Sequence, residues 1–73
     1  MFRYILEIHG MRCGMCETHV NNVIRTNFDV KKVKSSHRKN ETVIASVNKL
    51  DEDKLRSIIS STGYELKNIT LEE

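Results

Sequence analysis

Two cysteines three positions apart, Cys13 and Cys16, are the residues of this 73-residue chain with the clearest chemistry. A thiolate is a soft donor that selects Cu(I), Zn(II) and similar ions. Two intervening residues let the chain curl back so that both sulfurs reach the same ion. A disulfide scaffold in a small secreted domain usually needs more cysteines at longer spacings. The pair therefore indicates a metal-binding or redox-active site.

The second cysteine opens a helical pattern, and this placement matters for its reactivity. Apolar residues at helical spacing predict a helix from about Met15 to Thr26, with a stripe at Cys16, Val20, Val23, Ile24 and Phe28. A helix N-terminus carries a partial positive charge that favours thiolate over thiol. We therefore expect a lowered thiol pKa. We also expect Cys16 to be the more sheltered ligand and Cys13 the exposed one.

The remaining segments predict how the cysteines are held in place. Alternation from Phe2 to His9 predicts a strand, which Gly10 ends, and Asp51 is a plausible N-cap for a second helix that closes at Gly63. Further strands are predicted at Val30, Val33 and Ser35, at Val43, Ala45 and Val47, and from Leu66 to Leu71. A hairpin turn is predicted at 37–41, between the first two of these strands. The inner face of the second helix is predicted to carry Leu55, Ile58, Ile59 and Thr62. The order is βαββαβ. It predicts an α+β, ferredoxin-like sandwich with a four-stranded antiparallel sheet and two helices on one face.

Length and charge narrow the functional classes. Residues 1–73 are expected to form a single domain, too small for a core together with a large substrate cavity. The net charge of +2 is mild, and no aromatic residues interleave with the cations of the stretch 31–39, so nucleic-acid binding is not expected. That stretch is interpreted as a soluble edge strand. No apolar run is long enough for membrane insertion, and the first eight residues include Arg3 and Glu7, so we expect a cytoplasmic protein.

Three further side chains near the cysteines are candidate donors. Met11 has a thioether sulfur, but after a strand and a glycine it is better interpreted as an apolar plug beneath the loop. His9 and His19 would complete a four-ligand Zn(II) site with the cysteines on ligand count alone. The strand and helix patterns place both histidines on other faces, so we interpret them as surface residues that could tune the site. Arg12 and Arg25 are interpreted as a basic rim that would steer an acidic partner.

The run Gly10-Met11-Arg12-Cys13-Gly14-Met15-Cys16 resembles the Gly-Met-x-Cys-x-x-Cys signature of the heavy-metal-associated domain family. The resemblance covers essentially the whole chain and extends to Gly63-Tyr64, which is similar to the Gly-Tyr that follows the second helix in that family. It implies that Cys13 and Cys16 bind the ion, and that Met11 packs into the core. Gly10 and Tyr64 would support the site, with the Tyr64 hydroxyl approaching the cysteines as in bacterial copper chaperones.

Two positions depart from the family pattern. Asp29 stands where the family usually has glycine before the second strand, so that turn is expected to differ locally. His9 and His19 are not standard features of copper chaperones and leave the identity of the ion open.

Several functions follow from the resemblance. The favoured one is a non-enzymatic copper chaperone that transfers Cu(I) to a metal-transporting P-type ATPase or its metal-binding domain. The alternatives are an N-terminal domain of such an ATPase or of a mercuric reductase, or a protein that binds Zn(II), Cd(II) or Hg(II). A metal-bridged homodimer stays open. A thiol-disulfide oxidoreductase is disfavoured because the chain is short for a thioredoxin-like sheet and has neither tryptophan nor proline.

Overall fold

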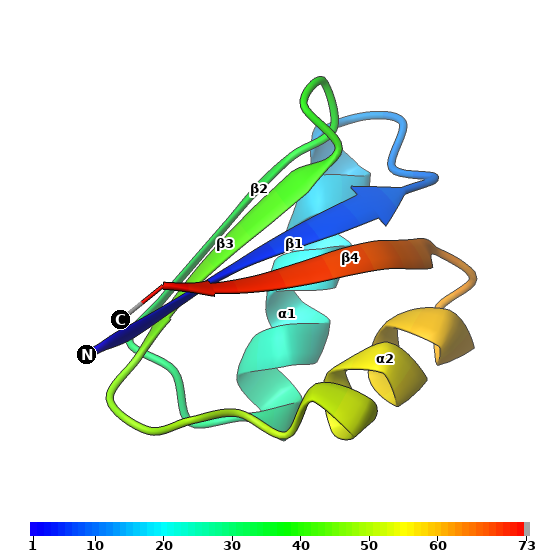
Figure 1. Ribbon diagram of the computed structural model, residues 1–73. Helices are drawn as coiled ribbons and strands as arrows, with labels where there is room; N and C mark the ends of the chain where they lie inside the picture. Colours follow the sequence, from blue (N-terminus) through cyan, green and yellow to red (C-terminus); the bar gives the residue numbers. More distant parts are fainter. Residues whose placement is uncertain (73) are drawn as a thin grey trace.

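The computed structural model describes residues 1–72 and has the expected element order. The elements are β1 (Phe2–His9), α1 (Gly14–Asn27), β2 (Lys32–Ser36), β3 (Glu41–Ser46), α2 (Glu52–Ser61) and β4 (Glu65–Glu72). All strand pairs are antiparallel and the sheet order is β2-β3-β1-β4. Both helices lie on one face of the sheet (Figure 1). The ferredoxin-like prediction is therefore confirmed.

The sheet order brings three loops together at one end of the molecule. β1 is a central strand, and at its end His9 pairs with Glu65, the first residue of β4. On its other side the Ile8 amide donates to the carbonyl of Asn40, in the β2–β3 hairpin, at 2.9 Å. The loop that follows β1 therefore emerges between that hairpin and the α2–β4 connection (Figure 1).

The core lies between the sheet and the two helices. Alternate residues of β1 face it, and each helix contributes two fully buried residues: the set is Tyr4, Leu6, Ile8, Val20, Ile24, Leu55 and Ile59. This burial removes the apolar face of each element from water, which is the main favourable contribution to folding. Neither helix in residues 1–72 is long and apolar enough to cross a membrane.

The third strand differs from the sequence expectation. The residues of β3 that face the core are Thr42, Ile44 and Ser46, and the strand ends there, leaving Val47 outside it and 54% exposed. Burying the two hydroxyls is tolerated because each is hydrogen-bonded: Thr42 pairs with Ser35 at 2.8 Å, and Ser46 donates to the carbonyl of Asn48 at 2.7 Å. The prediction that Val47 belongs to this strand was wrong.

The turn residues behave as ordinary backbone chemistry requires. The Asp51 carboxylate caps α2 by accepting from the Lys54 amide at 3.2 Å, and Gly63 follows the helix with a φ of +90°. In residues 1–72 Asn40 alone among non-glycine residues has a positive φ. Asp29 therefore occupies a conformation open to any residue, and its replacement of the family glycine introduces no strain there.

Candidate metal centre

The loop between β1 and α1 begins at a position that only glycine fills easily. Gly10 has a φ of +105°, in the left-handed region. A Cβ at this position would lie 3.4 Å from Cδ1 of Tyr64, which is tighter than most contacts of that kind. Glycine thus serves two purposes: it lets the chain turn out of the sheet, and it leaves room for the Tyr64 ring beside the loop.

The loop is held from beneath by Met11. Its side chain is 6% exposed and belongs to the same core cluster as the buried residues of β1 and α1. A thioether packed this deeply contributes apolar contacts rather than a free lone pair at the surface. Met15, by contrast, is 82% exposed, so the two motif methionines have different environments.

Cys13 precedes the first residue of α1, and Cys16 lies in the first turn of that helix. Cys13 is the N-cap residue in extended conformation, and its carbonyl accepts from the amides of Cys16 and Glu17 at 3.1 and 3.2 Å. Both thiols are free; Cys13 is exposed, whereas Cys16 is partly buried and packs against the core. No side chain in the described chain caps this helix start. Because the Cys16 amide is already bonded to the Cys13 carbonyl, the amides of Gly14 and Met15 are the ones left to favour negative charge at the sulfurs.

The electrostatics of the loop act most strongly on Cys16. A hydrogen bond from the Tyr64 hydroxyl, together with backbone groups of Arg12 and Cys13, lowers the pKa of the Cys16 thiol to about 7. The same hydrogen bond raises the pKa of Tyr64, because the phenol stabilises the neighbouring sulfur by keeping its proton. Near neutral pH a large fraction of Cys16 is thus thiolate, which is the form that binds metals.

The two histidines occupy separate surroundings. His9 Nε2 lies 2.6 Å from a carboxylate oxygen of Glu7, on the exposed surface. His19 Nδ1 lies 3.4 Å from the Tyr64 hydroxyl. Within residues 1–72 no three His, Cys, Asp or Glu side chains are placed to hold one ion. The structure therefore does not assemble the four-ligand Zn(II) set, and it brings His19 toward the site only through Tyr64.

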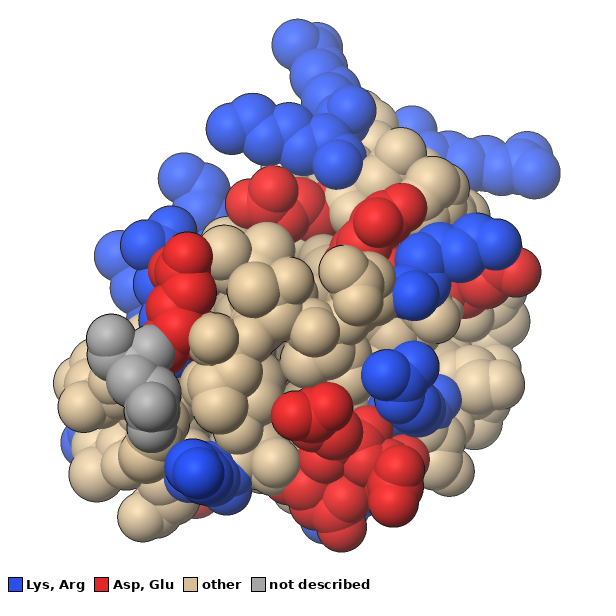
Figure 2. All heavy atoms as spheres, in the orientation of Figure 1, with Lys and Arg blue, Asp and Glu red and all other residues tan. Residues whose placement is uncertain are grey.

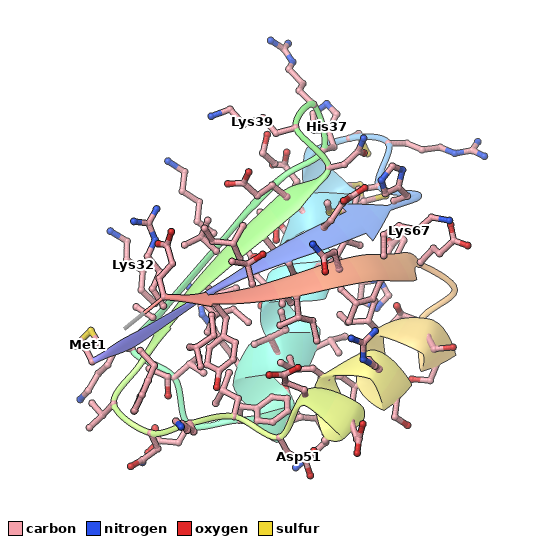
Figure 3. All side chains as sticks on the ribbon, viewed as in Figure 1. Met1, Lys32, His37, Lys39, Asp51 and Lys67 are labelled. Carbon is pink, nitrogen blue, oxygen red and sulfur yellow. The ribbon has the colours of Figure 1, made fainter. Side chains whose placement is uncertain are left out.

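One contact beside the motif was missed by sequence reasoning. The Glu17 carboxylate accepts from the His37 amide at 2.7 Å and lies 2.6 Å from His37 Nδ1. His37 lies at the β2–β3 hairpin (Figure 3). Its pairing with Glu17 therefore ties the hairpin to the start of α1. These bonds lower the pKa of Glu17. An acidic residue in the first turn of a helix was the available signal, but its partner 20 residues away was not deducible.

Positive charge gathers at the same end of the molecule. Arg12 in the loop is exposed, as are Arg38 and Lys39 in the hairpin, and Lys and Arg side chains project from this end in Figure 2. Arg25 does not join them, because it lies in the last turn of α1. At 1.5 Å per residue that turn is well over 10 Å from the cysteines. The predicted rim of Arg12 and Arg25 is therefore corrected to Arg12 and the hairpin cations.

Comparison with known proteins agrees with this geometry. Residues 5–65 match the family model described as the heavy-metal-associated domain. No curated protein sequence gives a significant match.

Among solved structures, the chain is 26% identical to the N-terminal domain of ZntA in its Zn(II) form, covering 90% of this chain and 89% of that one, with a TM-score of 0.80. It is 26% identical to the yeast copper transporter domain Ccc2a, solved in apo and Cu(I)-loaded states, covering 100% and 97% with a TM-score of 0.79. The CopZ metallochaperone shares the fold at 22% identity and a TM-score of 0.77, covering 89% of this chain and 98% of CopZ.

Proposed function

Since the chain belongs to the heavy-metal-associated domain family, we propose that Cys13 and Cys16 hold one Cu(I) ion and pass it to a partner protein by ligand exchange. The observation that carries this proposal is the pair of free thiols at the start of α1, one of them with a pKa of about 7. A soft monovalent ion suits two thiolates and needs no further protein ligand.

The unequal exposure of the two thiols supports an order of transfer. Cys13 lies at the surface, where an incoming thiolate reaches the ion first, whereas Cys16 is partly buried against the core. A partner cysteine would displace Cys13 while Cys16 still holds the ion. Cys16 would leave last. Exchange of this kind needs neither hydrolysis nor a covalent protein intermediate, so no enzymatic step is proposed.

The proposed partner is a metal-transporting P-type ATPase or its metal-binding domain. The family includes such domains, and the cations Arg12, Arg38 and Lys39 around the thiols favour approach of an acidic surface. We propose that residues 1–73 act as one domain in the cytoplasm, where thiols stay reduced. Whether the chain is free-standing or part of a longer protein does not alter this chemistry.

Zn(II) is the second candidate ion. The favouring observation is the similarity to the ZntA domain solved in its Zn(II) form, whose 26% identity is close to the 26% and 28% found for Ccc2a. Zn(II) prefers four ligands, and the described residues bring no third His, Cys, Asp or Glu to the cysteines. Zinc binding would therefore require solvent, a partner residue or a second copy, as in a metal-bridged homodimer. Cd(II) and Hg(II) share the soft chemistry of the site.

Titration of the reduced protein with Cu(I) against a competing chelator tests the proposal. We expect tight one-to-one binding that is lost in Cys13→Ser and in Cys16→Ser. Arg25→Ser, a change at the far end of α1, serves as the control and should bind normally. Undiminished affinity in both cysteine variants would refute the proposed site. Metal analysis of protein isolated anaerobically identifies the ion. Zinc at one equivalent per chain would assign Zn(II) to the site in place of Cu(I).

A further inference from the structure

The face of the sheet opposite the helices carries a groove that the thiol chemistry does not use. Alternation along β3 turns Val43 and Ala45 toward this face, because their neighbours Thr42 and Ile44 are fully buried on the other one. Both side chains line a groove with a volume of about 590 Å³. The floor of this groove is therefore apolar.

The strands on either side of the floor carry longer, cationic side chains. Lys32 of β2 and Arg3 of β1 both pair with Ala45, so the three residues form one row across the sheet. Lys34 stands beside Val43 in the next row. All three cations line the groove, and Lys32 points away from the helices in Figure 3. Short apolar side chains thus lie between two cationic walls.

These cations are available to an anion from outside the domain. Within residues 1–72 neither Lys32 nor Lys34 forms an ion pair, and both side chains are exposed. Arg3 pairs with Glu72 at 3.7 Å, but the two side chains of this pair are 60% and 51% exposed. An exposed pair of this kind contributes little to stability. An incoming carboxylate can therefore take the place of Glu72.

We propose that this groove binds an extended, acidic segment of a partner protein that carries carboxylates at alternate positions. Side chains on one side of an extended chain recur about every 6.6 Å, since each residue advances about 3.3 Å. Lys32 and Lys34 have the same spacing, because they lie two residues apart in a strand. Two alternate carboxylates of a segment lying along β3 meet both lysines at once, and the rest of the segment covers the apolar floor.

The shape of the groove favours a protein segment over a lipid surface. The floor residues Val43 and Ala45 are shorter than the lysines beside them, so they are recessed below the ends of the walls. A plane of lipid headgroups would meet the lysine ammonium groups without contacting the floor. A single extended chain is narrow enough to enter between the walls and contact both.

The groove is remote from the cysteines. Phe2, at the start of β1, lines it, whereas the loop that carries Cys13 follows His9 at the end of the same strand. At about 3.3 Å per residue, the length of β1 puts more than ~20 Å between the two sites. A partner bound in the groove leaves both thiols free to exchange an ion. The proposal therefore does not rest on the proposed function.

Two kinds of variant separate the groove from the overall charge of the domain. The double variant Lys32→Gln/Lys34→Gln removes one wall. Its matched control, Arg25→Gln/Arg56→Gln, removes the same charge from the two helices on the other side of the sheet. Ala45→Leu keeps every charge and fills the floor. None of these five residues is fully buried, so the fold is expected to survive, which backbone amide spectra verify.

The probe is the synthetic peptide acetyl-Gly-Glu-Val-Glu-Val-Gly-amide. Its control, acetyl-Gly-Glu-Glu-Val-Val-Gly-amide, has the same composition but adjacent carboxylates. Each is titrated into metal-free, reduced protein at low ionic strength while backbone amide shifts are recorded. We expect the alternating peptide to shift the amides of β2 and β3. Binding should be severalfold weaker for the control peptide, for Lys32→Gln/Lys34→Gln and for Ala45→Leu, and nearly unchanged for the helix double variant.

The alternatives give different results. Equal affinity for the two peptides, or equal loss in the two double variants, would overturn the proposal, because attraction to net charge would then suffice. Undiminished binding to Ala45→Leu would overturn the groove as the site. Absence of peptide binding would also overturn the proposal, and retention of the protein on phosphatidylglycerol vesicles would then assign this face to a lipid surface. Failure to bind Cu(I) would refute the proposed function and leave these outcomes unaffected.

Discussion

The two helices begin in different ways, although the same backbone physics acts at both ends. The start of α2 is closed by its own chain: Asp51 places a carboxylate on the Lys54 amide. At the start of α1 the corresponding residue is Cys13, and its side chain caps nothing. An exposed helix N-terminus with free amides favours an anion. At α2 that anion is the Asp51 carboxylate of the fold, whereas at α1 the place is left to thiolates.

The open start of α1 is instead supported from outside the helix. Met11 is buried beneath it, Tyr64 reaches it from the α2–β4 connection, and His37 bonds to Glu17 from the hairpin. A local cap makes a helix end stable by itself. Distant supports keep an end ordered while the amides of Gly14 and Met15 and the two sulfurs stay accessible. Four predictions test this contrast.

Exchanging the cap chemistry should have the largest effect. Cys13→Asp gives α1 the carboxylate that α2 already has, at a residue whose backbone is already extended, as an N-cap requires. We expect Cu(I) affinity to fall by several orders of magnitude, since one of two soft ligands is replaced by a hard one. Meanwhile the apo protein should gain about 1 kcal/mol in free energy of unfolding relative to Cys13→Ala.

Urea unfolding of the two apo variants and chelator competition with Cu(I) provide the measurements. Equal stability of the aspartate and alanine variants would mean that the start of α1 is not short of a cap, and the contrast between the helices would fail.

Removing the support beneath α1 is next in size. Met11→Ala deletes a side chain that is 6% exposed and should cost about 2–5 kcal/mol of unfolding free energy. In so small a domain this is a large fraction of the total stability. Met11→Leu, which nearly conserves volume, should cost less than about 1.5 kcal/mol. Denaturant unfolding of the apo protein measures both. Equal losses in the two variants would assign Met11 a role other than filling space.

The supports of α1 differ in how far the sequence predicts them. The Cys13–Cys16 pair, the burial of Met11 and the order of the elements along the chain follow from local spacing and alternation, which act over a few residues. The contacts of Tyr64 with His19 and of His37 with Glu17 span 45 and 20 residues. They depend on which strand ends meet, and hence on the sheet order and register. The family resemblance suggested the place of Tyr64, but no spacing rule pairs it with His19.

Strand β3 shows a second limit of sequence reasoning. Hydrophobicity alone did not reveal that Thr42 and Ser46 face the core, because their burial depends on hydrogen bonds to the Ser35 hydroxyl and to the backbone carbonyl of Asn48. From the sequence alone, the cationic stretch 31–39 is likewise interpreted only as a soluble edge strand. Only the folded chain brings the hairpin that carries Arg38 and Lys39 to the end of the molecule where α1 begins (Figure 1).

Removing the local cap of α2 should have a moderate effect. Asp51→Ala leaves the Lys54 amide without its acceptor and should cost about 1 kcal/mol. Asp51→Ser, which keeps a capping oxygen, should restore most of the stability. Cu(I) affinity should stay at the wild-type value, because α2 starts far along the chain from the thiols and at the opposite end of the molecule in Figure 1. Thermal unfolding and chelator competition measure the two quantities. A loss of affinity in Asp51→Ala would show that the two helix starts are coupled.

The smallest expected effect concerns Glu17, the titratable carboxylate through which His37 supports the start of α1. The amide and ring of His37 lower the pKa of Glu17 below its ordinary value of 4.5. A carboxyl whose pKa is depressed by folding stabilises the protein above its unfolded pKa, and this contribution is lost as pH falls through the folded value. Between neutral pH and about pH 5 the wild type should therefore melt at a higher temperature than Glu17→Gln. Below the ordinary carboxyl range the difference in melting temperature should shrink toward zero.

The matched control is Glu52→Gln, which replaces an exposed carboxylate in the first turn of α2. Its melting temperature should follow that of the wild type over the same pH range. Melting temperatures followed by circular dichroism from pH 7 to pH 3 decide the matter. Parallel curves for wild type and Glu17→Gln would mean that the hairpin does not support the start of α1 through this carboxylate, and that the distant supports are fewer than the geometry indicates.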